Sequence, residues 1–183
     1  MTDENALMLQ VKAGQLDSLA VLFENNQVRL FNYFLRMGNS RSLSEDFVQE
    51  TFMRVLAYRT SFTGDNSFRS WIYRIARNAA IDYFRKNKNA NKLDELKEEQ
   101  LEGQGEITDL LESEQKHQLF YEALNSISSA HREIIILSRF QQLKYEEIAD
   151  LLECNLNTLK TRMRSAISQL KMSYQQLNCE ENR

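Results

Sequence analysis

Proline is absent from this chain of 183 residues, and glycine occurs only five times. These two residues are the ones that most often interrupt helices and form the tight turns of β-hairpins. The shortage of both argues against a fold rich in sheets and favours long, uninterrupted helices. The sequence therefore predicts an all-α protein.

Cysteine is scarce as well, because only Cys154 and Cys179 are present and they form no CxxC pair. This argues against a disulfide framework and against a thiolate metal site. We expect Cys154 to be an ordinary free thiol, with redox sensitivity as the alternative. No run approaches the roughly 18 apolar residues that a membrane helix requires, and residues 1–5 lack a basic and apolar leader. We expect no membrane insertion, no secretory signal and a cytoplasmic location.

Acidic residues are concentrated in the middle of the chain, although the net charge is only −3. Residues 1–90 hold 12 Lys+Arg and 9 Asp+Glu, residues 91–114 hold 2 and 9, and residues 115–183 hold 9 and 8. The middle segment also contains Gly103 and Gly105 and few apolar residues, as a flexible tether does. We predict an acidic linker at 89–108 that joins helical domains at 1–88 and 109–177, followed by a tail at 178–183.

Helix boundaries are predicted from apolar spacing and from capping residues. Gly14 and Gly38 stand where helix C-caps belong, and Ser42 with Glu45 matches a capping box. The predicted helices span 18–37, 42–59 and 68–88 in the first domain, and 109–125, 131–140, 145–152 and 158–174 in the second.

The last predicted helix is amphipathic and basic, because 157–171 contains four basic residues and no acid. The helix before it carries the small Ala149 where a second helix could cross closely, so the pair is typical of a helix-turn-helix. Such a motif needs polar side chains in the first turns for base edges and Lys or Arg for phosphates. The alternative is a solvated basic face in an ordinary bundle. The candidate DNA-binding residues are Thr158, Lys160, Thr161, Arg162, Arg164, Ser165 and Lys171.

The helix predicted at 68–88 is a second cationic element, since Asp82 is its single acid. Aromatic side chains among arginines suit single-stranded or distorted nucleic acid, where bases stack and phosphates are neutralised. Trp71 lies at the edge of the apolar arc and either packs in the core or stacks on DNA. Tyr83 is expected on the buried arc. The candidate DNA contacts of this helix are Arg69, Arg74, Arg77, Asn78, Arg85 and Lys88.

The helix predicted at 42–59 has a polar face that includes a methionine. Asp46, Gln49, Glu50 and Met53 lie together, opposite apolar residues such as Phe52. A methionine amid polar groups suggests a protein contact. The alternative is a singly exposed methionine without a role.

Three stretches of the sequence resemble a known family. They are SEDFVQETFMRV at 44–55, FRSWIYRIARNAAIDY at 68–83, and Arg132-Glu133 followed by YEEIA at 145–149. In this order, and over nearly the whole chain, they resemble the bacterial RNA polymerase sigma factors of the extracytoplasmic-function (ECF) type.

The resemblance implies a transcription initiation factor that directs core polymerase to promoters and helps to open the DNA. The first domain would dock on the clamp helices of the polymerase β′ subunit and open the minus-ten element, with the 61–67 loop and the 68–88 helix on that strand. The second domain would recognise the minus-thirty-five element. The implied partners are core RNA polymerase through its β′ and β subunits, promoter DNA and an anti-sigma protein. The implied polymerase contacts are Asp46, Gln49, Glu50, Met53 and Arg54.

The second domain departs from the usual family pattern in its turns. Ile127-Ser128 replaces a Leu-Pro pair, Lys144 replaces an N-capping Ser or Thr, and Glu-Cys-Asn at 153–155 replaces Gly-Ile-Pro. If Glu153 adopts the left-handed conformation that glycine tolerates, we expect a cost near 1 kcal/mol.

Two other classes of protein compete with this interpretation. A conventional helix-turn-helix regulator would bind duplex operators without polymerase, but it has no need for a basic and aromatic first domain. An enzyme is not indicated, because His117 and His131 lack metal-spaced partners and no Gly-rich phosphate loop is present. We expect no catalytic residue, no metal site and no cofactor.

Overall fold

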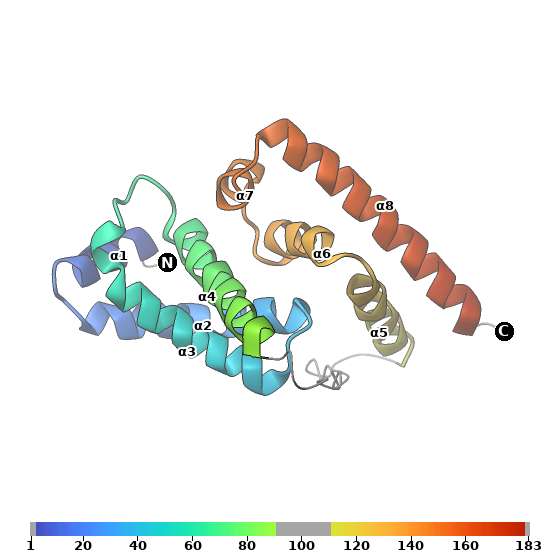
Figure 1. Ribbon diagram of the computed structural model, residues 1–183, viewed down its shortest axis with the longest axis horizontal. Helices are drawn as coiled ribbons and strands as arrows, with labels where there is room; N and C mark the ends of the chain where they lie inside the picture. Colours follow the sequence, from blue (N-terminus) through green and yellow to red (C-terminus); the bar gives the residue numbers. More distant parts are fainter. Residues whose placement is uncertain (1–2, 91–110, 182–183) are drawn as a thin grey trace. The chain divides into compact units, whose positions relative to one another are not determined.

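The computed structural model describes residues 3–90 and 111–181, and helices joined by short turns make up this part of the chain (Figure 1). The prediction of an all-α protein with two helical domains is confirmed. Helices α1 to α4 form one compact unit and α5 to α8 form the other. Nearly all of the linker predicted at 89–108 lies outside the described residues, and positions 89 and 90 belong to the last turn of α4.

The helix bounds agree with the sequence prediction at most ends. The helix α1 has no counterpart among the predicted helices, and α8 continues well past residue 174, into the predicted tail. The first unit contains α1 (Glu4–Lys12), α2 (Asp17–Arg36), α3 (Arg41–Ala57), the 3-10 turn η1 (Arg59–Ser61) and α4 (Phe68–Ala90). The second contains α5 (Leu111–Ser126), α6 (Ser129–Ile135), the π-helical turn η2 (Ile136–Phe140), α7 (Tyr145–Leu151) and α8 (Leu156–Glu181).

Glycines end the first two helices as predicted. Gly14 has a φ of +99° and Gly38 a φ of +94°, in the left-handed region where a Cβ atom is strained. After α1, the Gly14 N–H donates to the Val11 carbonyl at 3.1 Å, and the Gln15 N–H donates to the Gln10 carbonyl at 2.9 Å. This pair of bonds is the Schellman motif, which satisfies carbonyls left open at a helix end.

The capping box predicted at Ser42 and Glu45 is wrong. The N-cap of α3 is Ser40, whose Oγ accepts a hydrogen bond from the Leu43 N–H at 3.3 Å. Ser42 therefore lies inside the first turn, and Glu45 pairs with Arg41 across one turn at 3.3 Å. Ser40 and Ser42 lie two residues apart, and the spacing from Ser42 to Glu45 led to the wrong N-cap.

Aromatic rings fill the core of the first unit, where α2, α3 and α4 pack together. The Phe34 and Phe47 ring centroids are 5.0 Å apart, and those of Tyr33 and Tyr73 are 5.2 Å apart at a steep angle. Such edge-to-face and tilted pairs are the favoured arrangements of aromatic rings. Tyr83, expected to be buried, is 40% exposed, because its ring contacts the buried Phe47 at 5.2 Å but also the exposed Phe84 at 5.4 Å.

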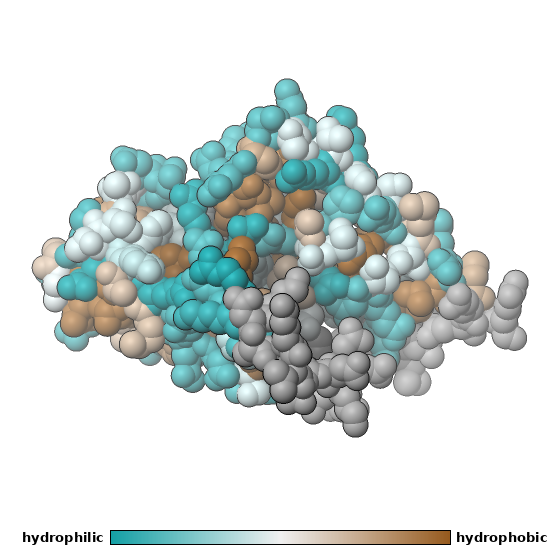
Figure 2. All heavy atoms as spheres, viewed as in Figure 1, coloured by the Kyte–Doolittle hydropathy of each residue, from teal (hydrophilic) through white to brown (hydrophobic). Residues whose placement is uncertain are grey.

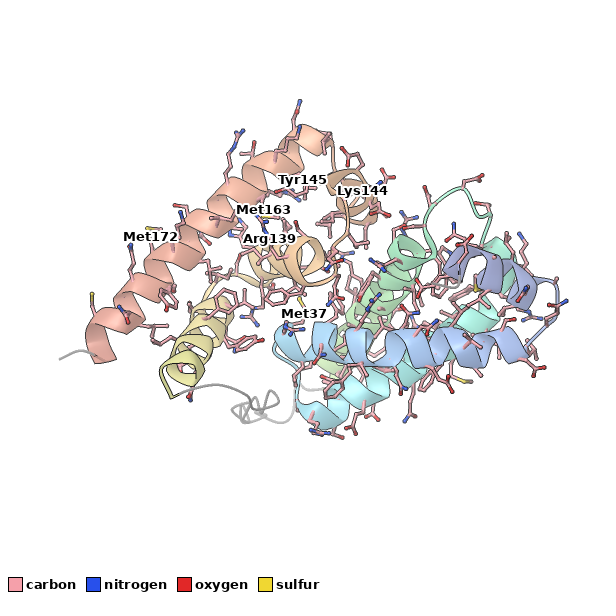
Figure 3. All side chains as sticks on the ribbon, turned by 180° about the vertical axis from the view of Figure 1, so that it is seen from behind. Met37, Arg139, Lys144, Tyr145, Met163 and Met172 are labelled. Atoms are coloured by element: carbon pink, nitrogen blue, oxygen red, sulfur yellow. The ribbon has the colours of Figure 1, made fainter. Side chains whose placement is uncertain are left out.

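The long helix α8 runs along α5, α6 and α7 in the second unit (Figure 1). Leu159, Met163 and Ala166 on its inner side are buried. Figure 3 labels Met163 and, further along the same helix, Met172, which is 60% exposed. Figure 2 shows that hydrophilic residues cover most of the visible surface, with hydrophobic residues in separate areas.

The Arg132 side chain caps the carboxyl end of α5. Its Nε donates to the Leu124 carbonyl at 2.9 Å, and its Nη2 bonds the carbonyls of Asn125 and Ile127. Burial lowers the pKa of Arg132, and the carbonyls compensate by solvating the cation. Ser128, which stands where the family usually has proline, is the N-cap of α6.

Candidate nucleic-acid and polymerase interfaces

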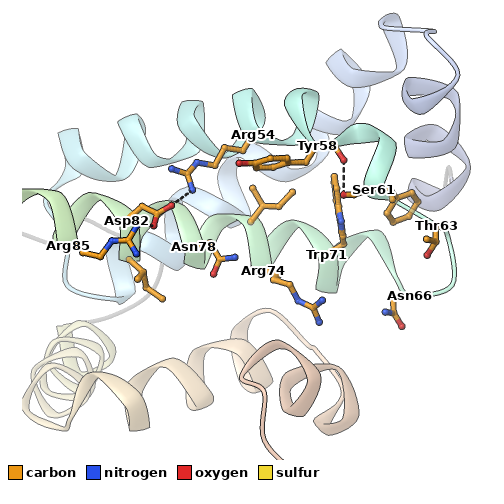
Figure 4. A pocket seen from close by; sticks show the side chains of 13 residues that line it. Arg54, Tyr58, Ser61, Thr63, Asn66, Trp71, Arg74, Asn78, Asp82 and Arg85 are labelled. Carbon is orange, nitrogen blue, oxygen red and sulfur yellow. Dashed lines mark hydrogen bonds and ion pairs between the residues drawn. The ribbon is translucent and has the colours of Figure 1, made fainter.

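A hollow of about 740 Å³ lies along α3 and α4 and is bounded at one end by the 61–67 loop (Figure 4). Trp71 stands in its wall, half-buried, and its ring centroid lies 5.3 Å from that of Phe62 and 6.1 Å from that of Phe68. Trp71 therefore packs on the core with one side and borders the hollow with the other. The lining residues are Arg54, Tyr58, Ser61, Phe62, Thr63, Asn66, Trp71, Arg74, Ile75, Asn78, Ile81, Asp82 and Arg85.

The hollow brings together three of the six DNA contacts predicted on α4. Arg74, Asn78 and Arg85 line it and are exposed. Arg69 and Arg77 are half-buried and lie outside the lining, and the side chain of Lys88 lies outside the described residues. In Figure 4 the side chains of Arg74 and Asn78 point away from α3.

Sequence reasoning missed the individual residues of the loop and of η1. Ser61, Thr63 and Asn66 add polar groups to the hollow, and Tyr58 adds an aromatic ring that is 55% exposed. The Ser61 hydroxyl donates to the Tyr58 carbonyl at 2.8 Å, which fixes the end of α3 to η1. The gap between the helices predicted at 42–59 and 68–88 indicates a loop, but no periodic pattern predicts which loop side chains face a cavity.

An ion-pair network joins α3 to α4 beside the hollow. The Arg54 Nη1 is 2.8 Å from an oxygen of Asp82, and its Nε is 2.6 Å from Glu50; the Arg85 Nη2 is 2.9 Å from Asp82. The hydrogen bond from Arg54 holds the pKa of Asp82 below its ordinary value. Burial alone would lower the pKa of Arg54, but its bonds to Glu50 and Asp82 outweigh this and raise it.

The outer face of α3 carries the residues predicted to contact polymerase. Asp46, Gln49, Glu50 and Met53 are all exposed, Met53 at 66%. Arg54 differs from them, because its side chain is only 19% exposed and lies between Glu50 and Asp82. The geometry suits Arg54 to hold Glu50 in place on this face.

The helices α7 and α8 form the helix-turn-helix expected from the sequence. Glu153 adopts the left-handed conformation with a φ of 52°, and the bonds from Glu153 to Asp150 and from Cys154 to Ala149 complete a Schellman motif. At the start of α7, the Glu147 carboxylate accepts from the Lys144 N–H at 2.8 Å, so a cap forms although Lys144 has no capping oxygen.

The seven candidate DNA contacts lie on the open side of α8. Six of them are exposed and Thr158 is half-buried. The Asn155 side chain accepts from the Thr158 N–H at 2.7 Å and so caps the helix. Asn155 and Asn157, which sequence reasoning did not single out, border a shallow hollow with Thr158, Thr161 and Arg162. The exposed candidates are Lys160, Thr161, Arg162, Arg164, Ser165 and Lys171.

Within residues 3–90 and 111–181, no group of three or more His, Cys, Asp or Glu side chains is placed to hold a metal ion. In the same residues, no helix is both long and apolar enough to cross a membrane.

Comparison with known sequences matches each unit to a defined region of one class of protein. Residues 22–90 match the Sigma-70 region 2 family, and residues 117–170 match the Sigma-70 region 4 family. The chain is 28% identical over 167 residues to the RNA polymerase sigma factor YlaC of Bacillus subtilis, covering 90% of this chain and 96% of that protein. It is 27% identical over 175 residues to the ECF RNA polymerase sigma-E factor of Escherichia coli K12, covering 89% of each.

Two solved structures share the fold. The sigma factor RpoE of Bartonella quintana, solved with the anti-sigma factor NepR, has a TM-score of 0.72 and 24% identity over 91% of this chain and 98% of that one. CnrH, solved with the cytosolic domain of CnrY, has a TM-score of 0.70 and 19% identity over 93% of this chain and 96% of that one.

A region 2 followed by a region 4 defines a sigma factor, the class of protein that directs RNA polymerase to promoters. This chain belongs to the ECF type of RNA polymerase sigma factors. Its partners therefore include core RNA polymerase and promoter DNA, which sets aside the alternative of an operator-binding regulator that never contacts polymerase.

Proposed function

We propose that the first unit captures the minus-ten strand in the hollow between α3 and α4 and so helps to open the promoter. The observation that carries this proposal is the combination of Trp71, Arg74 and Asn66 around one open space. A base that has left the duplex can stack on an indole ring, and guanidinium groups at the rim can neutralise its phosphates. Amide side chains can donate to and accept from the edge of an unpaired base.

The second unit supplies recognition of the minus-thirty-five element. We assign Thr158, Thr161, Arg162 and Ser165 to base edges in the major groove, because they occupy the first turns of α8 on its open side. We assign Lys160, Arg164 and Lys171 to phosphates, since a flexible ammonium or guanidinium group gives affinity without sequence preference.

The outer face of α3 binds core polymerase in this proposal, with Asp46, Gln49, Glu50 and Met53 on the clamp helices of β′ and Arg54 supporting Glu50. An exposed methionine within an acidic and polar face offers apolar contact area with a charged rim, as interfaces do. The two compact units are separate domains in this proposal, and the β subunit is the second polymerase partner.

The protein acts in the cytoplasm and catalyses no reaction of its own in this proposal. An anti-sigma protein is a further proposed partner. This proposed partner is supported by the structure of RpoE with an anti-sigma factor, because RpoE shares the fold of this chain.

Run-off transcription with purified core polymerase and a promoter library tests the proposal. We expect initiation at a defined promoter class only when the chain is present, and weak binding of duplex DNA by the chain alone. The triple variant D46A/Q49A/E50A should bind core polymerase more weakly at unchanged helical content. The double variant E24A/N25A, on exposed positions of α2, is the matched control. Equal transcription with and without the chain would contradict the proposal.

A further inference from the structure

The helix α1 lies against the 61–67 loop, which forms one end of the hollow (Figure 1). One side chain makes most of the polar contact. Asn5 donates from Nδ2 to the Asn66 carbonyl at 3.2 Å and to the Gly64 carbonyl at 3.5 Å. Its Oδ1 accepts from the Phe68 N–H at 2.6 Å, at the first residue of α4.

This last bond is a helix cap supplied from a distant segment of the chain. The first N–H groups of a helix have no partner within the helix, and a side-chain oxygen usually satisfies them from the residue just before it. Ser67 caps α4 in this usual way, because its Oγ accepts from the Ser70 N–H at 3.2 Å. Asn5 adds an oxygen from 63 residues away for the Phe68 N–H. Its amide therefore ties α1 both to the start of α4 and to the backbone of the loop that precedes it.

One further contact holds the same loop to α1. The Lys12 ammonium donates to the Phe62 carbonyl at 2.6 Å, and Phe62 itself is buried against the Trp71 ring. In the middle of the loop, Gly64 has a φ of +85° and faces α1, since a Cβ there would lie 3.7 Å from the methyl groups of Leu9. The loop is thus held at its start by Lys12 and at its end by Asn5.

We propose that α1 positions the minus-ten strand recognition loop, with Asn5 as the positioning residue. The proposal rests on the proposed function of the hollow. It adds that α1 holds the 61–67 loop in a single conformation. A loop that is ordered before DNA arrives loses less conformational freedom on binding, so it binds more tightly and discriminates better between bases. Asn5 touches no DNA in this proposal and acts through the backbone of Gly64 and Asn66.

The test compares holoenzymes reconstituted with wild type, N5A, N5D and N25A. Asn25 lies exposed on α2 and is the matched control. Binding is measured to promoter DNA with a pre-opened minus-ten region, in two series with single base changes in the minus-ten or the minus-thirty-five element. N5A removes all three hydrogen bonds of this side chain. We expect it to lose about fivefold to tenfold of the discrimination between minus-ten bases, which corresponds to the net effect of about one hydrogen bond. Discrimination at minus-thirty-five and affinity for core polymerase should not change, and N25A should behave as wild type.

The N5D variant separates loop positioning from simple helix capping. Its carboxylate keeps the acceptor for the Phe68 N–H but loses the donors to Gly64 and Asn66. We expect N5D to unfold at a higher temperature than N5A and yet to discriminate between minus-ten bases as poorly as N5A does. If N5D restores discrimination along with stability, Asn5 is a cap only and the proposal is overturned.

A fourth variant, N66A, distinguishes failure of this proposal from failure of the proposed function. Asn66 lines the hollow, so N66A should change the minus-ten preference if the loop recognises that strand. If N66A and N5A both discriminate as wild type does, the assignment of the loop to the minus-ten strand fails. If N66A loses discrimination and N5A keeps it, the loop assignment stands and the role of α1 is overturned.

Discussion

The Asp82 carboxylate forms ion pairs with two arginine side chains. Its negative charge therefore helps to hold α3 against α4. Its folded-state pKa lies below the ordinary value of 3.8, chiefly because of the hydrogen bond from Arg54. A carboxylate with a lowered pKa stabilises the fold fully above its unfolded pKa, and this contribution is lost as the pH falls through the folded-state pKa.

We predict that D82N unfolds at a lower temperature than wild type at neutral pH, and that the difference shrinks as the pH falls below 3.8 and through the lowered folded-state pKa of Asp82. Thermal unfolding followed by circular dichroism over a pH series measures this. E24Q, at an exposed position of α2, should leave the midpoint unchanged at every pH. A difference between D82N and wild type that persists at acid pH would show that shape, not charge, joins the helices at this point.

Position along α8 separates base recognition from phosphate binding. Arg162 borders the hollow at the start of the helix, whereas Lys171 is exposed about 14 Å further along at the usual helical rise. We predict that R162A changes preference at particular bases of the minus-thirty-five element and costs about 1–3 kcal/mol there. We expect K171A to weaken binding to all promoter variants alike and to reduce the salt slope by about one counterion.

Holoenzyme binding to a promoter-variant series at several salt concentrations measures both effects. A uniform loss with R162A and a changed base preference with K171A would mean that the helix docks in the opposite direction.

Exposure of single residues was predictable where a helical period governs it. Asp46, Gln49, Glu50 and Met53 on α3 and six of the seven candidates on α8 are exposed as expected, because a side chain three or four positions along must share the face of its neighbour. The position of Arg54 was not predictable, because its partner Asp82 lies on another helix. For Trp71 the sequence left a choice between the core and DNA, and its ring packs on Phe62 and Phe68 while it also lines the hollow.

At the scale of elements, the turn of the helix-turn-helix contains a strained residue. Glu153 has a φ of 52° at the C′ position of the Schellman motif, where glycine avoids the contact between Cβ and the backbone. We predict that E153G stabilises the second unit by about 0.5–1 kcal/mol. E153A, which keeps the Cβ atom, should not stabilise it. Chemical denaturation followed by circular dichroism measures both, and equal stability of E153A and E153G would contradict a backbone origin.

The ends of helices were predicted well where a single residue type determines them. They were predicted poorly where contacts with residues distant in sequence determine them. Gly14 and Gly38 ended helices as expected, because few other residues tolerate their φ. The helix α1 was missed, and isolated helices of its length, nine residues, are marginal without packing. Its stability comes from burial of Met8 and Val11 and from Asn5, all of which need partners distant in sequence.

At the scale of the molecule, each unit has its own buried core. Leu124 is 1% exposed in the second unit, so we expect L124A to cost about 2–5 kcal/mol through the cavity it leaves. Because the substitution acts on one core, amide hydrogen exchange should accelerate in α5 to α8 and stay unchanged in α1 to α4. Faster exchange in both units would show that the two cores unfold as one cooperative body.

The sequence contains one tryptophan, and it stands in the wall of the hollow. Indole emission depends on the polarity and the quenchers around the ring, so the protein carries an intrinsic optical label at the place where a nucleobase would stack. Oligonucleotides without a dye can be titrated against the full chain, and the emission of Trp71 then reports occupancy of this hollow separately from DNA bound at α8. The same signal gives the rate at which the hollow fills after rapid mixing of the chain with such an oligonucleotide, on a time scale that a gel-based assay does not resolve.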